Sequence, residues 1–257
     1  MRRRTLLLGV AATFAATGCS SANGSTSTPV GGTAVPGGPD PVVRWVLTGG
    51  GLAAGQIALR PPRLAVYGNG EVIADAAYRS DLPAEDIAEL IAQLSENLRG
   101  PAATKRRDDL PVIASASTTE FSVRSAHGTY NARAEALDEL RQQEGYPTAL
   151  YDARDRIGAV HQQVVASGQP YTARRVRLVI QVGPAQTDEI LPWPATIELP
   201  AGAAQDEVRL ADLDGQHARN VVRTVSRDLD LNGTWKAYRT ASGMPLRASW
   251  RYLLPDE

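Results

Sequence analysis

The strongest constraint on the fold is an Asn-Gly pair that stands between two short apolar runs. Asn69 and Gly70 separate residues 64–67 from residues 71–74. Asn-Gly is favourable at the centre of a tight hairpin turn because both residues accept positive φ. We therefore predict a β-hairpin at this point and an antiparallel sheet around it.

Six further alternating or apolar runs predict the other strands. Two pairs of these runs are joined by short turns that contain glycine, and each pair predicts another hairpin. The run before residue 183 places its apolar side chains on one face, which is typical of a half-buried strand. The runs are residues 41–47, 118–124, 129–133, 175–182, 235–239 and 246–253.

Three segments with apolar residues at helical spacing predict helices. The first covers residues 83–98. The second covers residues 149–167 and follows Thr148, a residue type that caps helix starts, and the third covers residues 216–229 after the similar cap Asp214. Each helix has one apolar face, so each can bury only that face against a neighbour.

Hairpins separated by single helices predict an α+β fold. We expect a mainly antiparallel sheet built from hairpins, with about three helices packed on it. Residues 42–257 form one globular domain or two packed lobes, 42–168 and 169–257, because no long linker divides them. The last predicted strand reaches almost to residue 257, so we expect the carboxyl end to belong to the fold.

Residues 1–18 have the organisation of a secretory signal peptide. Three arginines at positions 2–4 precede an apolar run, and small residues precede Cys19. The apolar run is shorter than the about 20 residues that a spanning helix needs. The segment Ala16-Thr17-Gly18-Cys19 is similar to a lipobox, in which the cysteine receives a diacylglycerol, with Ala16 where leucine is usual. An ordinary signal peptide followed by a chance cysteine is the alternative.

Arg3 and Arg4 also fit a twin-arginine signal, which directs the export of folded proteins. One free position and two leucines follow them, as that pattern requires. Adjacent arginines also arise by chance in a basic amino-terminal region. The choice between the twin-arginine route and the general secretory route therefore stays open.

Residues 19–41 are predicted to comprise the lipidated Cys19 and a flexible linker of Ser, Thr, Gly and Pro. Some 22 such residues span on the order of 25 Å. The expected location is the outer face of the cytoplasmic membrane, with the lipid on Cys19 as the contact to the membrane. We expect the polar faces of helices 83–98 and 216–229 to carry acids, which an anionic membrane would not attract. The domain would then be held near the membrane without lying on it.

Charge argues against a nucleic-acid partner. The full chain has 27 basic and 28 acidic residues, and removal of residues 1–18 leaves 24 against 28, a formal charge of −4. Nucleic-acid-binding domains usually concentrate Lys and Arg on one face. The single cysteine also excludes an internal disulfide and a cysteine-based metal cluster.

Sequence motifs of known chemistry are lacking. The three glycines 49–51 superficially fit a dinucleotide fingerprint, but we expect no helix after them, because two prolines and a hairpin follow. His127, His161 and His217 have no metal-ligand spacing, and each is expected to be a surface or capping residue. Neither a serine-hydrolase signature nor a phosphate loop is present. A hydrolase that uses two carboxylates stays open, because its acids need no fixed spacing.

Asp228-Leu229-Asp230-Leu231-Asn232-Gly233 matches the first half of a calcium loop. The second half fails, because Arg239 occupies the position of the closing glutamate. We therefore expect neither a metal nor a cofactor, and interpret the segment as a helix end followed by a turn.

Trp193 is the aromatic residue most suggestive of a binding surface. Prolines on both sides place it outside regular sheet, on a connection where an exposed ring would contact a partner. The other tryptophans lie on predicted strands, where aromatic residues more often fill cores.

The chain resembles a group of uncharacterised lipoproteins of actinobacteria. The resemblance rests on the lipobox, the glycines 49–51, the segment Pro62-Arg63-Leu64-Ala65-Val66-Tyr67-Gly68-Asn69-Gly70 and the terminal Leu253-Leu254-Pro255-Asp256-Glu257. It implies export and lipidation but brings no activity and no catalytic residues.

The leading functional hypothesis is a non-catalytic binding module of the cell envelope with a protein, glycan or lipid partner. The alternatives are an envelope hydrolase that uses carboxylates, or a lipid or glycan carrier. A large dry cavity would favour the carrier, and a cleft with two inward acids would favour the hydrolase.

Overall fold

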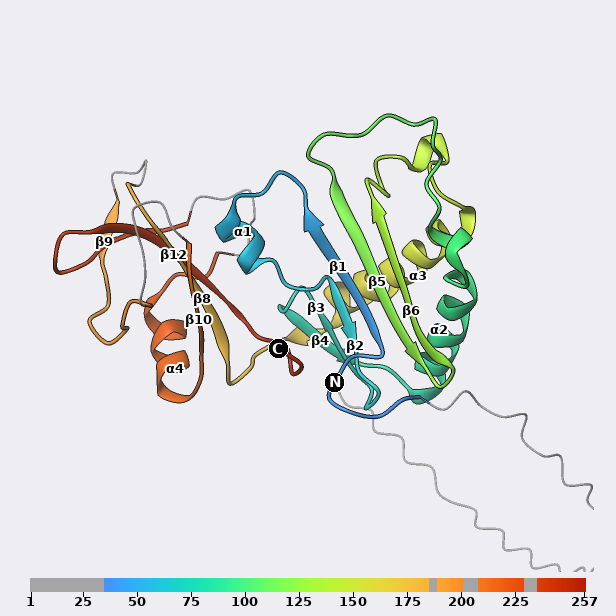
Figure 1. Ribbon diagram of the computed structural model, residues 1–257. Helices are drawn as coiled ribbons and strands as arrows, with labels where there is room; N and C mark the ends of the chain where they lie inside the picture. The colour runs from blue at the N-terminus through green and yellow to red at the C-terminus, as the bar shows by residue number, and fades with distance from the viewer. Residues whose placement is uncertain (1–34, 185–188, 201–207, 229–234) are drawn as a thin grey trace, which may run out of the picture. The chain divides into compact units, whose positions relative to one another are not determined.

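The computed structural model describes residues 35–184, 189–200, 208–228 and 235–257 (Figure 1). Its first sheet has seven strands in the order β6-β5-β1-β2-β3-β4-β7, and every neighbouring pair is antiparallel. The strands are β1 (Val43–Gly49), β2 (Leu64–Val66), β3 (Glu71–Ala74), β4 (Tyr78–Asp81), β5 (Ser117–Ser125), β6 (Gly128–Glu135) and β7 (Gln169–Pro170).

Two long helices cover one face of this sheet, α2 (Ala84–Asn97) and α3 (Thr148–Ser167). Two short 3-10 segments, η1 (Pro101–Thr104) and η2 (Arg141–Gln143), lie in the connections. The apolar residues that predicted α2 are all buried in the first core, against inward side chains of the strands. They are Ile87, Leu90, Ile91, Leu94 and Leu98.

The Asn69-Gly70 hairpin is confirmed, although its turn geometry differs from expectation. In the pair, Gly70 has a positive φ of 102° and Asn69 does not. The Gly70 N–H donates to Tyr67 O at 3.1 Å, and the Asn69 side chain accepts from the N–H of Glu71 at 3.1 Å. The turn is therefore a three-residue loop in which Gly70 supplies the positive φ. Asn69 stabilises the turn through its side-chain oxygen rather than through a positive φ.

A second sheet has five strands in the order β10-β8-β12-β11-β9. Neighbours are antiparallel except β9 and β11, which pair in parallel. Helix α4 (Gly215–Thr224) contributes buried Ala218 and Val221 to the core under this sheet. The strands are β8 (Val176–Val182), β9 (Ile190–Pro192), β10 (Val208–Leu213), β11 (Ala237–Arg239) and β12 (Pro245–Tyr252). The α+β prediction is confirmed, with antiparallel pairing dominant.

A short helix, α1 (Ala54–Leu59), follows the three glycines, where no helix was expected. That expectation was wrong because the segment between the glycine turn and the two prolines is long enough for a helix of six residues. The helix packs against the second sheet, where Leu59 forms a small core with Val179 and Trp235. The dinucleotide interpretation still fails, because β1 is antiparallel to both its neighbours and belongs to no βαβ unit.

Strands β2 and β3 contribute side chains to two hydrophobic cores, one on each of their faces. Leu64 and Val66 point into the core under α2 and α3. The alternate residues Ala65 and Ile73 point to the opposite side, into the core of β8, β12 and α4. Because successive side chains of a strand face opposite sides, these two strands carry apolar residues on both faces.

The segment after β12 ties the two sheets together by polar contacts. Asp256 accepts hydrogen bonds from Arg44 of β1 at 2.6 Å and from the hydroxyl of Tyr67 at 2.5 Å. Glu257 accepts two bonds, at 2.6 and 2.7 Å, from Arg251, whose side chain is 2% exposed. This agrees with the expectation that the carboxyl end belongs to the fold.

Helix α4 is shorter than predicted, because the main-chain groups that follow Thr224 form hydrogen bonds with side chains of the second sheet instead of continuing the helix. Val225 is extended, with φ −101° and ψ 131°, and its carbonyl accepts from Trp250 Nε1 at 2.8 Å. The next N–H, of Ser226, donates to the hydroxyl of Tyr238 at 2.9 Å. Helix α3 begins one residue earlier than predicted, at Thr148, with Pro147 as its cap.

Contacts of the domain begin ahead of residue 42. Val35 is partly buried against the first core, and Asp40 pairs with Arg124 at 3.5 Å. None of the helices in the described ranges combines the length and apolar character that a membrane-spanning helix needs.

We predict that Gly55→Ala destabilises the domain, although alanine is the better helix former. A Cβ at Gly55 would lie 2.7 Å from Cη2 of Trp235, and Trp235 is 5% exposed. Overpacking of this kind costs about 1–3 kcal/mol, which exceeds the gain in helix propensity of about 1 kcal/mol. Thermal melting should show a lower midpoint, and Ile57→Ala on the exposed side of α1 should change it little. An unchanged or raised midpoint for Gly55→Ala would contradict the packing described.

We also predict acid sensitivity at Glu257. Burial raises the pKa of this carboxyl, but the hydrogen bonds and charge of Arg251 outweigh burial and place the pKa below its ordinary value of 4.5. A lowered pKa in the folded state gives stability that is complete above the unfolded pKa and is lost as pH falls below it. Glu257→Gln should lower stability at neutral pH by about 1.5–3 kcal/mol and flatten its fall below about pH 4.5.

The measurement is chemical denaturation across this pH range, with the exposed Glu139→Gln as the matched control. If Glu257→Gln retains the acid dependence of the unchanged chain, the ion pair with Arg251 does not supply it.

Candidate functional site

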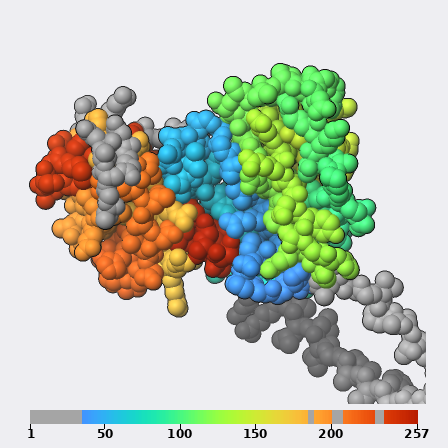
Figure 2. Space-filling view, in the orientation of Figure 1, coloured from blue at the N-terminus to red at the C-terminus, as the bar shows by residue number. Residues whose placement is uncertain are grey.

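A groove of about 930 Å³ lies between α4 and the segment that leads into β8. Figure 2 shows the orange surface that contains α4 beside the yellow-gold surface of that segment. The groove is lined by four arginines, one aspartate and five small, apolar or aromatic residues, and we call it the arginine groove. The lining residues are Ala173, Arg174, Arg175, Asp214, Gly215, Ala218, Arg219, Val222, Arg223 and Tyr252.

The helical repeat of α4 builds one wall and part of the floor. Ala218 and Val222 are four residues apart and form an apolar row toward the second core. Arg219 and Arg223 are shifted by one position and form a parallel row at the exposed edge. The helix therefore presents an apolar stripe beside two cations.

The polar face of α4 is basic, which corrects the expectation of an acidic face. That expectation included Asp228 in the helix, but α4 ends at Thr224 and contains no acid. Asp214 at the amino-terminal cap makes no side-chain capping bond. Like charges four residues apart destabilise a helix by about 0.2–0.5 kcal/mol, but Arg223 also lies in the last turn, where the helix dipole favours a cation by about 0.3–1 kcal/mol.

Three of the four groove arginines, Arg174, Arg219 and Arg223, form no ion pair with a carboxylate in the described part of the chain. Arg219 donates to the neutral Gln216 side chain at 2.9 Å, and Arg174 and Arg223 have no hydrogen-bond partner among the described residues. Arg175 is instead held by a main-chain oxygen of Glu257. Arg174, Arg219 and Arg223 are thus available to a ligand.

Tyr252 supplies a rigid aromatic part of the groove floor. Its ring packs edge-on against Trp250 and Tyr171, with centroids 5.1 and 6.1 Å away. The guanidinium of Arg227 lies 5.1 Å from the Tyr252 ring centroid, and burial lowers the pKa of Arg227. Arg227 also donates a hydrogen bond to Ala76 O at 2.9 Å. It therefore links Tyr252 in the groove floor to the turn between β3 and β4 of the first sheet.

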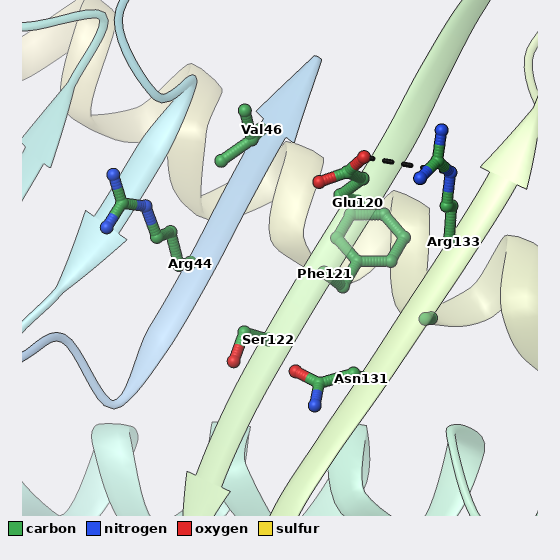
Figure 3. Close-up of a pocket in the computed structure, with 8 residues that line it drawn as sticks. Arg44, Val46, Glu120, Phe121, Ser122, Asn131 and Arg133 are labelled. Carbon is green, nitrogen blue, oxygen red and sulfur yellow. Dashed lines mark ion pairs between the residues drawn. The ribbon is translucent and has the colours of Figure 1, made fainter. Parts of the chain in front are cut away.

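A second candidate surface is the face of β1, β5 and β6 opposite α2 and α3, which has a shallow pocket of about 510 Å³ (Figure 3). Glu120 and Arg133 are 3.8 Å apart across two strands, and Arg44 is held by Asp256. Its three charged residues are therefore paired, and it offers mainly neutral hydrogen-bonding groups. Figure 3 labels Arg44, Val46, Glu120, Phe121, Ser122, Asn131 and Arg133.

His161 is buried, which corrects its expected place at the surface. The residue is 7% exposed, and its Nε2 lies 2.7 Å from Oδ2 of Asp75. Asp75 also pairs with Arg63 at 2.9 Å. The spacing of Ile157, His161 and Val164 along the buried stripe of α3 could have revealed this position. His127 and His217 are exposed, as expected.

The His161 pair is better explained by structure than by catalysis. Within the ranges described, no hydroxyl or thiol hydrogen-bonds to His161, so a nucleophile is not in place. Asp75 and Ala76 both have positive φ, 51° and 47°, in the turn between β3 and β4. The contact therefore fixes a strained turn against α3.

Trp193 is half-buried, and both its ring and its N–H are engaged. Nε1 donates to Ile197 O at 2.8 Å, and the ring packs edge-on against Tyr238 at 5.4 Å. One side still lines a pocket of about 450 Å³ beside Arg239 and Thr240. A role as a binding surface stays a prediction.

Other predicted residues lie partly or wholly outside the described ranges. Cys19, Arg3 and Arg4 precede residue 35, and residues 229–233 of the calcium-like segment are also outside. Asp228 is described, and its main chain is held by the Ser249 hydroxyl at 2.7 and 2.8 Å. No cluster of three metal-ligating side chains occurs in the described ranges.

For the carboxylate alternative, Glu71 and Asp81 share a small pocket, and Glu96, Asp152 and Asp155 line another of about 580 Å³. Glu71 and Asp81 are direct neighbours across β3 and β4, and their pocket of about 240 Å³ also contains Arg79. Sequence reasoning did not find the arginine groove. Its signals were the adjacent Arg174 and Arg175 and the four-residue spacing of Arg219 and Arg223.

Comparison of the chain with protein-family models, with curated protein sequences and with solved structures gives no match in any of the three. The candidate site therefore depends on the geometry described above.

We predict that Arg223→Gln leaves the fold intact and changes its melting midpoint little. The substitution removes a like-charge repulsion of about 0.2–0.5 kcal/mol within α4, but it also removes a cation from the last turn, where the helix dipole favours positive charge by about 0.3–1 kcal/mol. Because salt screens both effects, any small difference at low salt should disappear at about 1 M salt. Arg156→Gln on α3, also exposed, is the matched control. A midpoint lowered equally at both salt concentrations would show that Arg223 has a structural partner.

Proposed function

We propose that the chain is an exported lipoprotein, anchored through Cys19 to the outer face of the cytoplasmic membrane, that acts as a non-catalytic binding module of the cell envelope. Its binding surface is the arginine groove, and its ligand is anionic. The observation that carries this proposal is the set of four arginines around an apolar floor, of which Arg174, Arg219 and Arg223 have no carboxylate partner among the described residues.

The composition of the groove supports binding over a purely structural role. A structural arginine usually finds a carboxylate, as Arg177 does with Asp212 at 2.8 Å and Arg251 with Glu257. The groove arginines Arg174, Arg219 and Arg223 have no such partner among the described residues. Cations without an internal partner tend to mark functional surfaces. Guanidinium groups favour carboxylate and phosphate ligands, which they bind through two parallel hydrogen bonds.

The anchor is supported by the sequence alone. Residues 1–18 have the three parts of a signal peptide, and Cys19 follows small residues as in a lipobox. Two acyl chains on one cysteine are enough for stable attachment, at about 0.8 kcal/mol per buried methylene.

We predict that Cys19→Ser abolishes lipidation and stable membrane attachment in the native bacterial host. The sulfur atom is the attachment point of the diacylglycerol, and serine does not replace it. The product should be either uncleaved precursor held by its apolar segment or soluble protein released by other cleavage. Mass spectrometry of the amino-terminal peptide from membranes should show Cys19 as the first residue, with a lipid adduct that the variant lacks.

Ser20→Ala is the matched control and should be lipidated normally. An unmodified Cys19 on an otherwise mature protein would contradict the anchor, while leaving the arginine groove untouched.

A further inference from the structure

We propose that the arginine groove binds the headgroups of anionic phospholipids and so seats the domain directly on the membrane that holds its anchor. This inference rests on the proposed function, because it names the ligand of the same groove. It also reverses the expectation that the domain is held near the membrane without lying on it.

The first step is charge complementarity. The groove presents four arginines against one aspartate, and three of them, Arg174, Arg219 and Arg223, are not paired with a carboxylate among the residues described. Asp212, the nearby acid of β10, is bound by Arg177 at 2.8 Å from both oxygens. A phosphodiester group is the common anionic feature of membrane lipids, and surface arginines near it are attracted within a Debye length.

The second step is the apolar floor, which separates a lipid from a soluble anion. Ala173, Ala218 and Val222 lie between the cations, with Tyr252 beside them. A site for a free phosphate would be expected to surround the anion with hydrogen-bond donors. A cationic rim over an apolar floor instead matches an amphiphile, whose phosphate meets the arginines while its glycerol and upper acyl carbons contact the floor.

The third step is the anchor. A few exposed arginines bind a membrane weakly from solution, and weak contacts become effective when a second attachment confines the protein. Cys19 is separated by residues 20–34 from the first described residue, Val35, so a lipid at Cys19 would keep the domain at high local concentration near headgroups. The groove would then set the orientation of an already attached domain.

The experiment uses the chain from residue 19 to residue 257 with Cys19→Ser, so that no lipid anchor obscures the groove. Both hydrophobic cores lie within residues 35–254, and this protein contains them completely. Co-sedimentation at low salt is measured with vesicles of phosphatidylcholine alone and of phosphatidylcholine mixed with phosphatidylglycerol. We expect binding to the mixed vesicles only, weakened by raised salt.

The variant pair separates the groove from general charge. R219Q/R223Q removes two groove arginines, and R156Q/K105Q removes two exposed basic side chains elsewhere. We expect the first to weaken binding about tenfold or more and the second to change it less than about twofold. Both should melt cooperatively like the unchanged chain, because all four side chains are exposed.

Three results would overturn the inference. One is binding to mixed vesicles that R219Q/R223Q leaves unchanged, which would place the contact elsewhere. Another is binding of inorganic phosphate or glycerol 3-phosphate in the groove without vesicle binding, which would make it a soluble-anion site. The third is no binding to any of these probes. Each leaves the lipid on Cys19 as a separate question, since the tested protein has no anchor.

Discussion

Strands β2 and β3 are buried on both of their faces, and the rest of the structure depends on this constraint. Leu64, Val66 and Val72 face α2 and α3, while Ala65 and Ile73 face the second sheet. Removing either layer would expose one apolar face of the same strands. At about 25 cal/mol per Å² of apolar surface, that exposure would destabilise the remaining layer as well. The second lobe therefore covers apolar side chains of strands that belong to the first sheet.

Polar contacts join the two lobes beside these doubly buried strands. The turn at Asp75 and Ala76, at the end of β3, receives Arg227 from the second lobe, and His161 from α3 holds the same turn within the first lobe. Asp256 of the second lobe accepts hydrogen bonds from Arg44 and Tyr67 of the first. Burial raises the pKa of Tyr67 further than its hydrogen bond to Asp256 does. The contacts of Arg227 and Asp256 join residues far apart in sequence, so they fix the position of one lobe against the other.

The sequence was informative where local chemistry decides the outcome. The Asn69-Gly70 hairpin, the apolar stripe of α2 and the alternation of β8 depend on neighbouring residues, and all three are present. Tertiary contacts decided the rest. Helix α1 exists because Trp235 and Val179 cover it, and α4 ends early because Trp250 and Tyr238 bind main-chain groups after it. No pattern within either segment encodes these partners.

The arginine groove escaped prediction for a related reason. Arg174 and Arg175 precede Arg219 by more than forty residues, and pairing of β10 with β8 brings the two segments together. The same pairing makes the groove rigid, because Tyr252 in its floor lies on the central strand β12 and packs against Trp250 and Tyr171. At the rim, Arg174 and Arg223 have no hydrogen-bond partner among the described residues, whereas Arg219 is bound to Gln216 and Arg175 to Glu257. A packed apolar floor beside unpaired guanidinium groups is suited to a phosphate-bearing headgroup, because each such guanidinium can bind a phosphate without any change in the fold.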